Sequence, residues 1–160
     1  MFGIDTRAGE PAPNPFYIQT PSGLADEQSR VLKYGDTFAV FDHLGDIKPT
    51  GLGEEGLFHN GTRHLSCLLL LLDQHRPLFL SSTVKEDNVL LTVDLTNPDA
   101  YIRDHLVIPR GTVHVSRTKF LWHGGCYERL LIRNFGQAEL TTTVSVSYSA
   151  DFAEIGRAHV

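Results

Sequence analysis

From residue 30 onward, the sequence is a succession of short strand-like segments, each ended by a turn signal. The clearest is 140–149, where Val144, Val146 and Tyr148 alternate with serines, a period of two that predicts a half-buried strand. Such segments recur roughly every 10 to 15 residues, and no window beyond residue 30 shows the 3.6-residue period of an amphipathic helix. We therefore predict an all-β fold, an antiparallel β-sandwich over residues 29–154.

Turn residues place several of the strands. Gly35-Asp36 and Gly124-Gly125 each separate two strand-like segments, which predicts hairpins over 30–41 and 112–135. Further strands are predicted at 62–72, 77–83 and 89–96. In the last of these, one face carries the alternating residues Val89, Leu91, Val93 and Leu95.

The apolar run 67–72 contains five consecutive leucines. It is far shorter than the about 20 residues that a membrane-spanning helix needs, so we expect no membrane partner. An unbroken apolar run of this length predicts a strand that is covered on both faces.

Charge and N-terminal composition narrow the partners and the location. The net charge is −5, which provides no basic surface for nucleic acid. The first 15 residues contain an Asp, a Glu and three prolines in place of the apolar core of a signal peptide, and the chain has only two cysteines. We therefore expect a cytoplasmic protein with a flexible N-terminal arm over residues 1–28.

Two site types are disfavoured by local spacing. Gly56 and Gly61 resemble a phosphate-binding loop, but Gly61 is followed by Thr62-Arg63 rather than by Lys and Ser/Thr, so a tight turn feeding a strand is predicted. His59 and His64 are five residues apart in a turn-to-strand segment, so they would lie on opposite faces if both were extended, and no third ligand has motif spacing. No metal, cofactor or catalytic motif is therefore expected.

Arg63 and Trp122 are candidate binding residues. An arginine between a turn and an apolar strand either snorkels or holds a carboxylate in bidentate geometry, and Asp87 is one possible partner. Trp122 either belongs to the core or forms a sugar-stacking platform, if it is exposed together with Tyr101, Phe120 and Tyr127. From the residues alone, this is a binding or structural β-domain.

Six short motifs, taken together, are characteristic of a known family: Gly56-Leu-Phe, Thr62-Arg63-x-Leu65-Ser66, Leu80-Ser-Ser, Asp87-Asn88, Asp94-Leu-Thr-Asn-Pro98 and Tyr127-Glu128-Arg129. Through them, residues 28–154 resemble the N-terminal domain of bacterial and archaeal glycogen debranching enzymes, the amylo-α-1,6-glucosidase-like proteins. The resemblance implies a β-sandwich that precedes an α/α-toroid catalytic domain, on which two carboxylates hydrolyse the glucosidic bond.

No acidic residue of this chain matches those two carboxylates, so the resemblance implies a non-catalytic accessory domain that shapes the cleft of the downstream domain. Arg63, Asp87 and Asn88 would then be interdomain or glucan contacts, or else they only stabilise turns. Residues 155–160 depart from the family and read like the translated start of a common sequencing adapter, which suggests the artificial tail of a truncated gene. Two alternatives remain: an autonomous carbohydrate-binding module that uses Trp122, and a structural β-sandwich used for assembly.

Overall fold

The computed structural model describes residues 28–49 and 54–155, and all regular secondary structure in these ranges is β-strand. The predicted arm at 1–28 and tail at 155–160 lie outside the described residues, apart from Gln28 and Ile155. The strands are β1 (Arg30–Tyr34), β2 (Thr37–Phe41), β3 (Gly56–His59), β4 (Thr62–Leu65), β5 (Cys67–Leu72), β6 (Leu78–Val84), β7 (Leu90–Thr96), β8 (Ala100–Ile102), β9 (His105–Ile108), β10 (Val113–Trp122), β11 (Gly125–Asn134) and β12 (Val144–Ser149). No helix in these ranges is long and apolar enough to cross a membrane.

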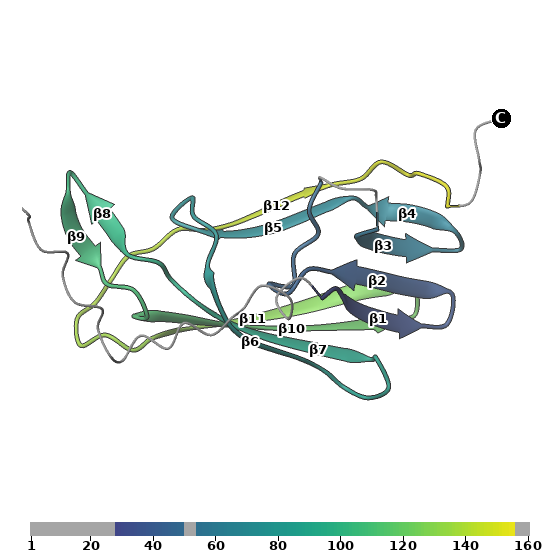
Figure 1. The fold of residues 1–160 in the computed structure, drawn as a ribbon, viewed down its shortest axis with the longest axis horizontal. Helices are drawn as coiled ribbons and strands as arrows, with labels where there is room; N and C mark the ends of the chain where they lie inside the picture. Colours follow the sequence, from purple (N-terminus) through teal and green to yellow (C-terminus); the bar gives the residue numbers. More distant parts are fainter. Residues whose placement is uncertain (1–27, 50–53, 156–160) are drawn as a thin grey trace, which may run out of the picture.

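The strands form two facing layers (Figure 1). One layer has the order β1-β2-β3-β4 and is continued by the β5–β12 pair, because a single residue, Ser66, separates β4 from β5. The other layer has the order β11-β10-β7-β6, and β8 and β9 form a separate hairpin. All of these pairs are antiparallel, so the predicted all-β fold is confirmed.

The core lies between the two layers. The first layer contributes Leu32, Phe41 and Leu70, all 0% exposed, and the second contributes residues of β7 and β10. The predicted inward face of 89–96 is confirmed, because burial is complete for Leu91, Val93 and Leu95. Removal of these apolar side chains from water is the main force that holds the layers together.

The leucine run differs in part from its prediction. The predicted strand 62–72 is split at Ser66, because β4 pairs with β3 whereas β5 pairs with β12. Leu70 and Leu72 are buried in the core, but Leu69 and Leu71 are only half-buried. The face that carries Leu70 and Leu72 is therefore the better covered of the two, although Leu68 on that face is half-buried.

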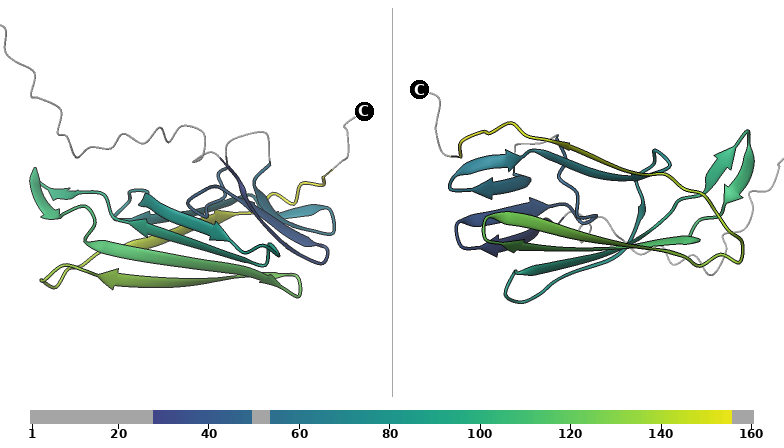
Figure 2. Two further views of the ribbon diagram at one scale, coloured as in Figure 1. Left: turned by 60° about the horizontal axis from the view of Figure 1, so that its bottom comes forward. Right: turned by 180° about the vertical axis from the view of Figure 1, so that it is seen from behind.

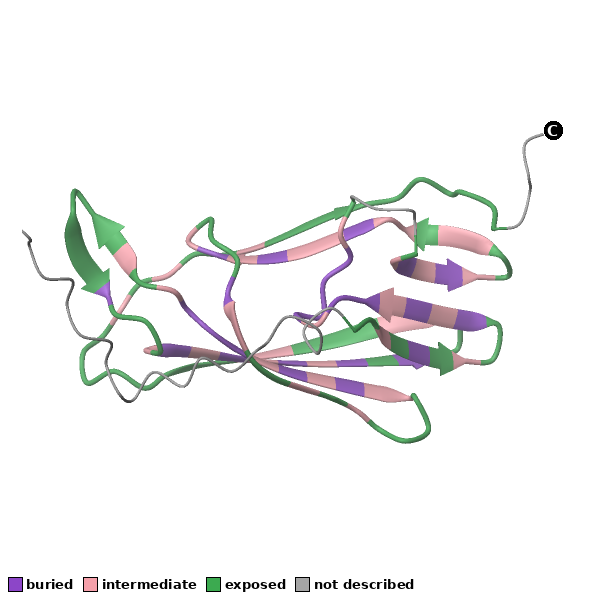
Figure 3. Ribbon diagram, viewed as in Figure 1, coloured by how far each residue is buried: buried purple, intermediate pink, exposed green. Residues whose placement is uncertain are grey.

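β12 is the strand predicted from the alternation in 140–149, but its apolar side is exposed. Its register with β5 places Val146 opposite Leu70, so both side chains point to the same side of the layer. Yet Val146 is 47% exposed and Tyr148 76% exposed, because β12 is the edge strand of its layer (Figure 3). The expectation of a half-buried strand was therefore wrong about its burial.

Four turns lie at one end of the sandwich, which we call the hairpin end: those after β1, β3, β6 and β10 (Figures 1 and 2). The turn after β3 is Asn60-Gly61, with φ of 48° and 79°, which suits a two-residue hairpin. Residues 56–59, predicted as part of a turn, instead form β3. The described chain also ends at this end of the sandwich, at Ile155, whose N–H donates to the Gly61 carbonyl at 2.8 Å.

Candidate functional site

An aromatic pocket lies at the hairpin end, and Trp122 is part of it. The pocket has a volume of about 300 Å³. It forms where the end of β1, the β6–β7 loop and the end of β10 meet. Its lining residues are Tyr34, Lys85, Val89, Leu90, Phe120, Leu121 and Trp122.

The aromatic rings around this pocket contact one another. The ring centroids of Tyr34 and Trp122 are 4.9 Å apart. Phe120 and Tyr127, which are register partners on β10 and β11, stack at 5.1 Å with 12° between their planes. Tyr101 lies on β8 at the opposite end of the sandwich, so the structure gathers three of the four aromatic residues considered for a platform (Figure 1).

Asp87 and Asn88 lie in the β6–β7 loop beside this pocket. An Asp87 Oδ1 atom accepts the Val89 N–H at 3.4 Å, and Asn88 adopts a φ of 55°. The Asn88 carbonyl also accepts the Lys33 N–H at 2.9 Å, which ties the loop to β1. Both residues therefore stabilise the turn that places Lys85 and Val89 in the pocket wall.

Arg63 pairs with Asp151 rather than with Asp87, so the suggested partner was wrong. The bidentate geometry was predicted correctly: Nε donates to Oδ1 at 3.1 Å, and Nη2 donates to Oδ2. The hydrogen bond from Arg63 lowers the pKa of Asp151. Because the Arg63 N–H also donates to the Ala153 carbonyl at 2.8 Å, this pair fastens the segment after β12 to β4.

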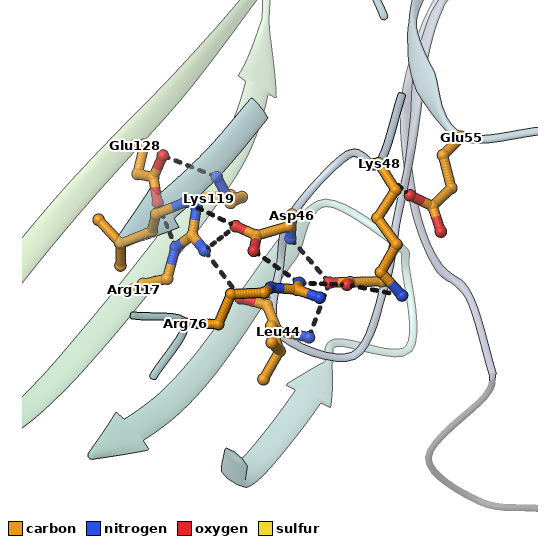
Figure 4. Close-up of polar contacts among 10 residues, drawn as sticks. Leu44, Asp46, Lys48, Glu55, Arg76, Arg117, Lys119 and Glu128 are labelled. Atoms are coloured by element: carbon orange, nitrogen blue, oxygen red, sulfur yellow. Dashed lines mark hydrogen bonds and ion pairs between the residues drawn. The ribbon is translucent and has the colours of Figure 1, made fainter. Parts of the chain in front are cut away.

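A buried cluster of charges between the layers escaped the sequence analysis (Figure 4). At its centre, Arg117 donates from Nη1 to Asp46 Oδ1 at 2.6 Å and to the Leu44 carbonyl at 2.9 Å. Asp46 also accepts from Arg76 at 2.8 Å. Arg117 is 1% exposed and Asp46 0%, so each charge depends on its partners to offset the loss of water.

Lys119 is the second buried cation of β10. Its Nζ lies 2.7 Å from Glu128 Oε2 and 5.0 Å from the ring centre of Phe41. Glu128 is therefore the anionic partner of this buried ammonium group. Burial and the nearby Arg117 charge lower the pKa of Lys119 to about 8, against the attraction of Glu128.

The pKa values of two carboxylates of the cluster are lowered as well, which for an acid favours the charged form. Burial by itself would raise the pKa of Asp42, but the hydrogen bond from Arg76 and the Asp46 N–H outweigh it and the pKa is lowered. Burial would likewise raise the pKa of Glu128, but Lys119 and Arg117 lower it. The cluster is therefore an array of mutually paired ions that joins β10, β11 and the loop after β2.

The cluster could have been found from strand periodicity. Counting by two along β10 from the buried Val113 places Arg117 and Lys119 on the core-facing side, between Val115 and Leu121. Two cations at inward positions of a central strand require buried partners. The alternation of residues 112–122 therefore already indicated a buried charge cluster on this strand.

The histidines are arranged differently from the prediction. His59 and His64 lie on β3 and β4, on either side of the Asn60-Gly61 turn, and their ring centres are 6.2 Å apart. Opposite faces were expected only if both residues lay in one extended segment, but the turn between them pairs β4 with β3. Among the described residues, no group of three or more His, Cys, Asp or Glu side chains is placed to hold a metal ion.

Comparison with known proteins places this all-β domain in a family. The family model for the N-terminal domain of (some) glycogen debranching enzymes matches residues 32–158, which is well over half of the chain. No curated protein and no solved structure matches it. The matched range contains β2 to β12, the aromatic pocket and the charge cluster. This chain belongs to the family of N-terminal domains found in some glycogen debranching enzymes.

Proposed function

We propose that this chain is the non-catalytic accessory domain of a glycogen-debranching-type glycoside hydrolase. In this proposal it packs against a downstream α/α-toroid catalytic domain and shapes one side of that domain's glucan cleft. The family supports the first part, because its members are the N-terminal domains of such enzymes. A domain in that position has the rest of the enzyme as its natural partner.

The observation that carries the proposal is the apolar surface along the last part of the described chain. Exposure is 47% for Val146, 76% for Tyr148, 63% for Phe152 and 52% for Ile155. These residues follow one another along a single segment, which Figure 3 shows as exposed. Soluble proteins rarely leave such a stretch uncovered unless it is an interaction surface. We assign it to contact with the catalytic domain.

The segment is also held in a fixed path. Arg63 binds Asp151, and backbone hydrogen bonds join the segment to β4 as far as Ile155. A partner domain that packs on this surface would therefore meet the hairpin end, where Asp87, Asn88 and Trp122 lie. This placement supports a role for these residues as interdomain or glucan contacts.

Catalysis by the isolated chain is the direct test. The purified 160-residue chain should release no glucose from a branched limit dextrin, whereas a chain extended by the continuing coding sequence should release it. Glucose release by the 160-residue chain itself would refute the non-catalytic role. An extended chain without several hundred further helical residues would refute the downstream toroid.

Self-assembly is the competing use of the same apolar segment. A structural sandwich would bury Tyr148 and Phe152 against a second copy. Sedimentation of the wild-type chain and of a Tyr148→Ser/Phe152→Ser variant separates the two functions. A stable oligomer that the variant abolishes, together with an extended enzyme that does not need these residues, would favour assembly.

A further inference from the structure

We propose that the aromatic pocket at the hairpin end is a binding subsite for a glucose unit of an α-glucan, with the Trp122 indole as its stacking surface. This inference rests on the proposed function, because the family supplies the polymer. The pocket residues supply the chemistry. No residue of the pocket is assigned a catalytic step.

The lining is suited to one face of a sugar ring. A pyranose presents C–H groups on its faces and hydroxyl groups around its rim. Aromatic faces carry negative charge density and attract polarised C–H groups. Tyr34, Phe120 and Trp122 supply three aromatic rings in a pocket of about 300 Å³, and half of the Trp122 surface is exposed.

The same residues also supply polar partners for the rim of a sugar. The Tyr34 hydroxyl, the Lys85 ammonium and the Trp122 indole N–H make no hydrogen bond to any described residue. Each can donate a hydrogen bond to a sugar hydroxyl oxygen. A wholly apolar partner side chain would bury these donors without acceptors, which costs free energy. An amphipathic ligand therefore fits the pocket better than an apolar anchor.

The pocket is held open before any ligand arrives. Trp122 contacts the Tyr34 ring at 4.9 Å and the His123 ring at 4.7 Å. The Lys33–Asn88 hydrogen bond fixes the loop that carries Lys85. A ligand therefore does not have to order these side chains, which favours binding by a small contact area.

Intrinsic fluorescence gives a direct test, because Trp122 is the only tryptophan of the 160-residue chain. Titration with maltohexaose and with glycogen should change the emission saturably. Unchanged emission at saturating maltohexaose would overturn the subsite. An emission change that occurs only when the catalytic domain is joined would also overturn it, since the pocket would then be an interdomain contact.

Affinity electrophoresis in glycogen-containing gels measures how strongly each variant binds the glucan. Trp122→Ala and Tyr34→Ala should weaken retardation by about tenfold, the loss expected for one aromatic contact. Tyr101→Ala is the matched control, since Tyr101 is an aromatic residue that is 60% exposed at the opposite end. Melting temperatures of all variants show whether the fold is kept. Equal loss for Tyr101→Ala, or none for Trp122→Ala, would contradict the proposal.

The two proposals fail in different experiments. If glucans leave Trp122 unchanged while the extended enzyme alone releases glucose, only the subsite is wrong. If maltohexaose binds through Trp122 but the 160-residue chain itself hydrolyses the dextrin, the subsite stands and the accessory role falls.

Discussion

The guanidinium of Arg117 and the carboxylate of Asp46 lie 2.6 Å apart, and neither side chain is more than 1% exposed. The two residues are 71 positions apart: Asp46 lies in the loop after β2 of one layer, and Arg117 lies on β10 of the other. Their pairing therefore joins the sheets by charge, where most of the surrounding contacts are apolar. If Asp46 is removed, Arg117 keeps only Glu128 as a charged partner, and if Arg117 is removed, Asp46 keeps only Arg76, so either change weakens the charge balance of the core.

We expect Asp46→Asn to lower the free energy of unfolding by about 1.5–3 kcal/mol, because Arg117 and Arg76 each lose one of two charged acceptors and keep only Glu128 and Asp42. Urea unfolding followed by circular dichroism measures the change. Asp94→Asn is the matched control: Asp94 is 33% exposed and lies 3.3 Å from His114, so its loss should cost less than about 1 kcal/mol. Equal costs would contradict the central role of Asp46.

Lys119 gives the domain a pH dependence whose sign is fixed. Its folded-state pKa of about 8 lies below the usual value of 10.5, so the unfolded chain holds more protons between these pH values. Stability therefore rises with pH in that window and is lowest, for this group, below pH 8. The burial of a charged lysine is the cause.

Between about pH 7.5 and 9.5, we expect the unfolding free energy of the wild type to rise relative to that of Lys119→Met by roughly 1–2 kcal/mol. Burial raises the pKa of Cys126, which contributes an opposite slope, so the comparison with the variant is needed. Lys33→Met, on an exposed side chain of β1, is the control and should follow the wild type. A parallel pair of curves for Lys119→Met would contradict the prediction.

Leu70 tests the position of the leucine-rich strand. It is 0% exposed, so Leu70→Ala should cost about 2–5 kcal/mol and Leu70→Asp should prevent folding. Leu80→Ala is the control, because Leu80 is 52% exposed and should cost far less. Thermal melting is the measurement. An unchanged melting temperature for Leu70→Asp would mean that the strand does not lie in the core.

Asp151 tests how the last segment is fastened. Asp151→Asn removes the charge that Arg63 binds, so the amide of Ile155 should exchange faster with deuterium while β7 is unaffected. Asp104→Asn, at an exposed position between β8 and β9, is the control. Unaltered exchange at Ile155 in the Asp151 variant would show that the backbone hydrogen bonds suffice.

Local sequence patterns predicted the hairpin over 30–41 and the buried side of β7 because a strand's period and its turn residues are local properties. The pairing of Arg63 with Asp151 joins positions 88 apart, which no spacing rule reaches. The alternation in β12 showed which side chains share a side, but not what covers them. In β10, by contrast, the period of two was enough to predict that Arg117 and Lys119 point toward the core.

The hydrogen-bonded segment from β12 to Ile155 has a mechanical consequence. Hydrogen bonds from Ile155 to Gly61 and from Arg63 to Ala153 run across the segment, so a pull away from the sheet breaks them one after another, starting at Ile155. Any body attached after this point begins at a fixed position and direction. Its local concentration beside the Asn60-Gly61 turn is then set by the length of the chain that connects it rather than by its own affinity.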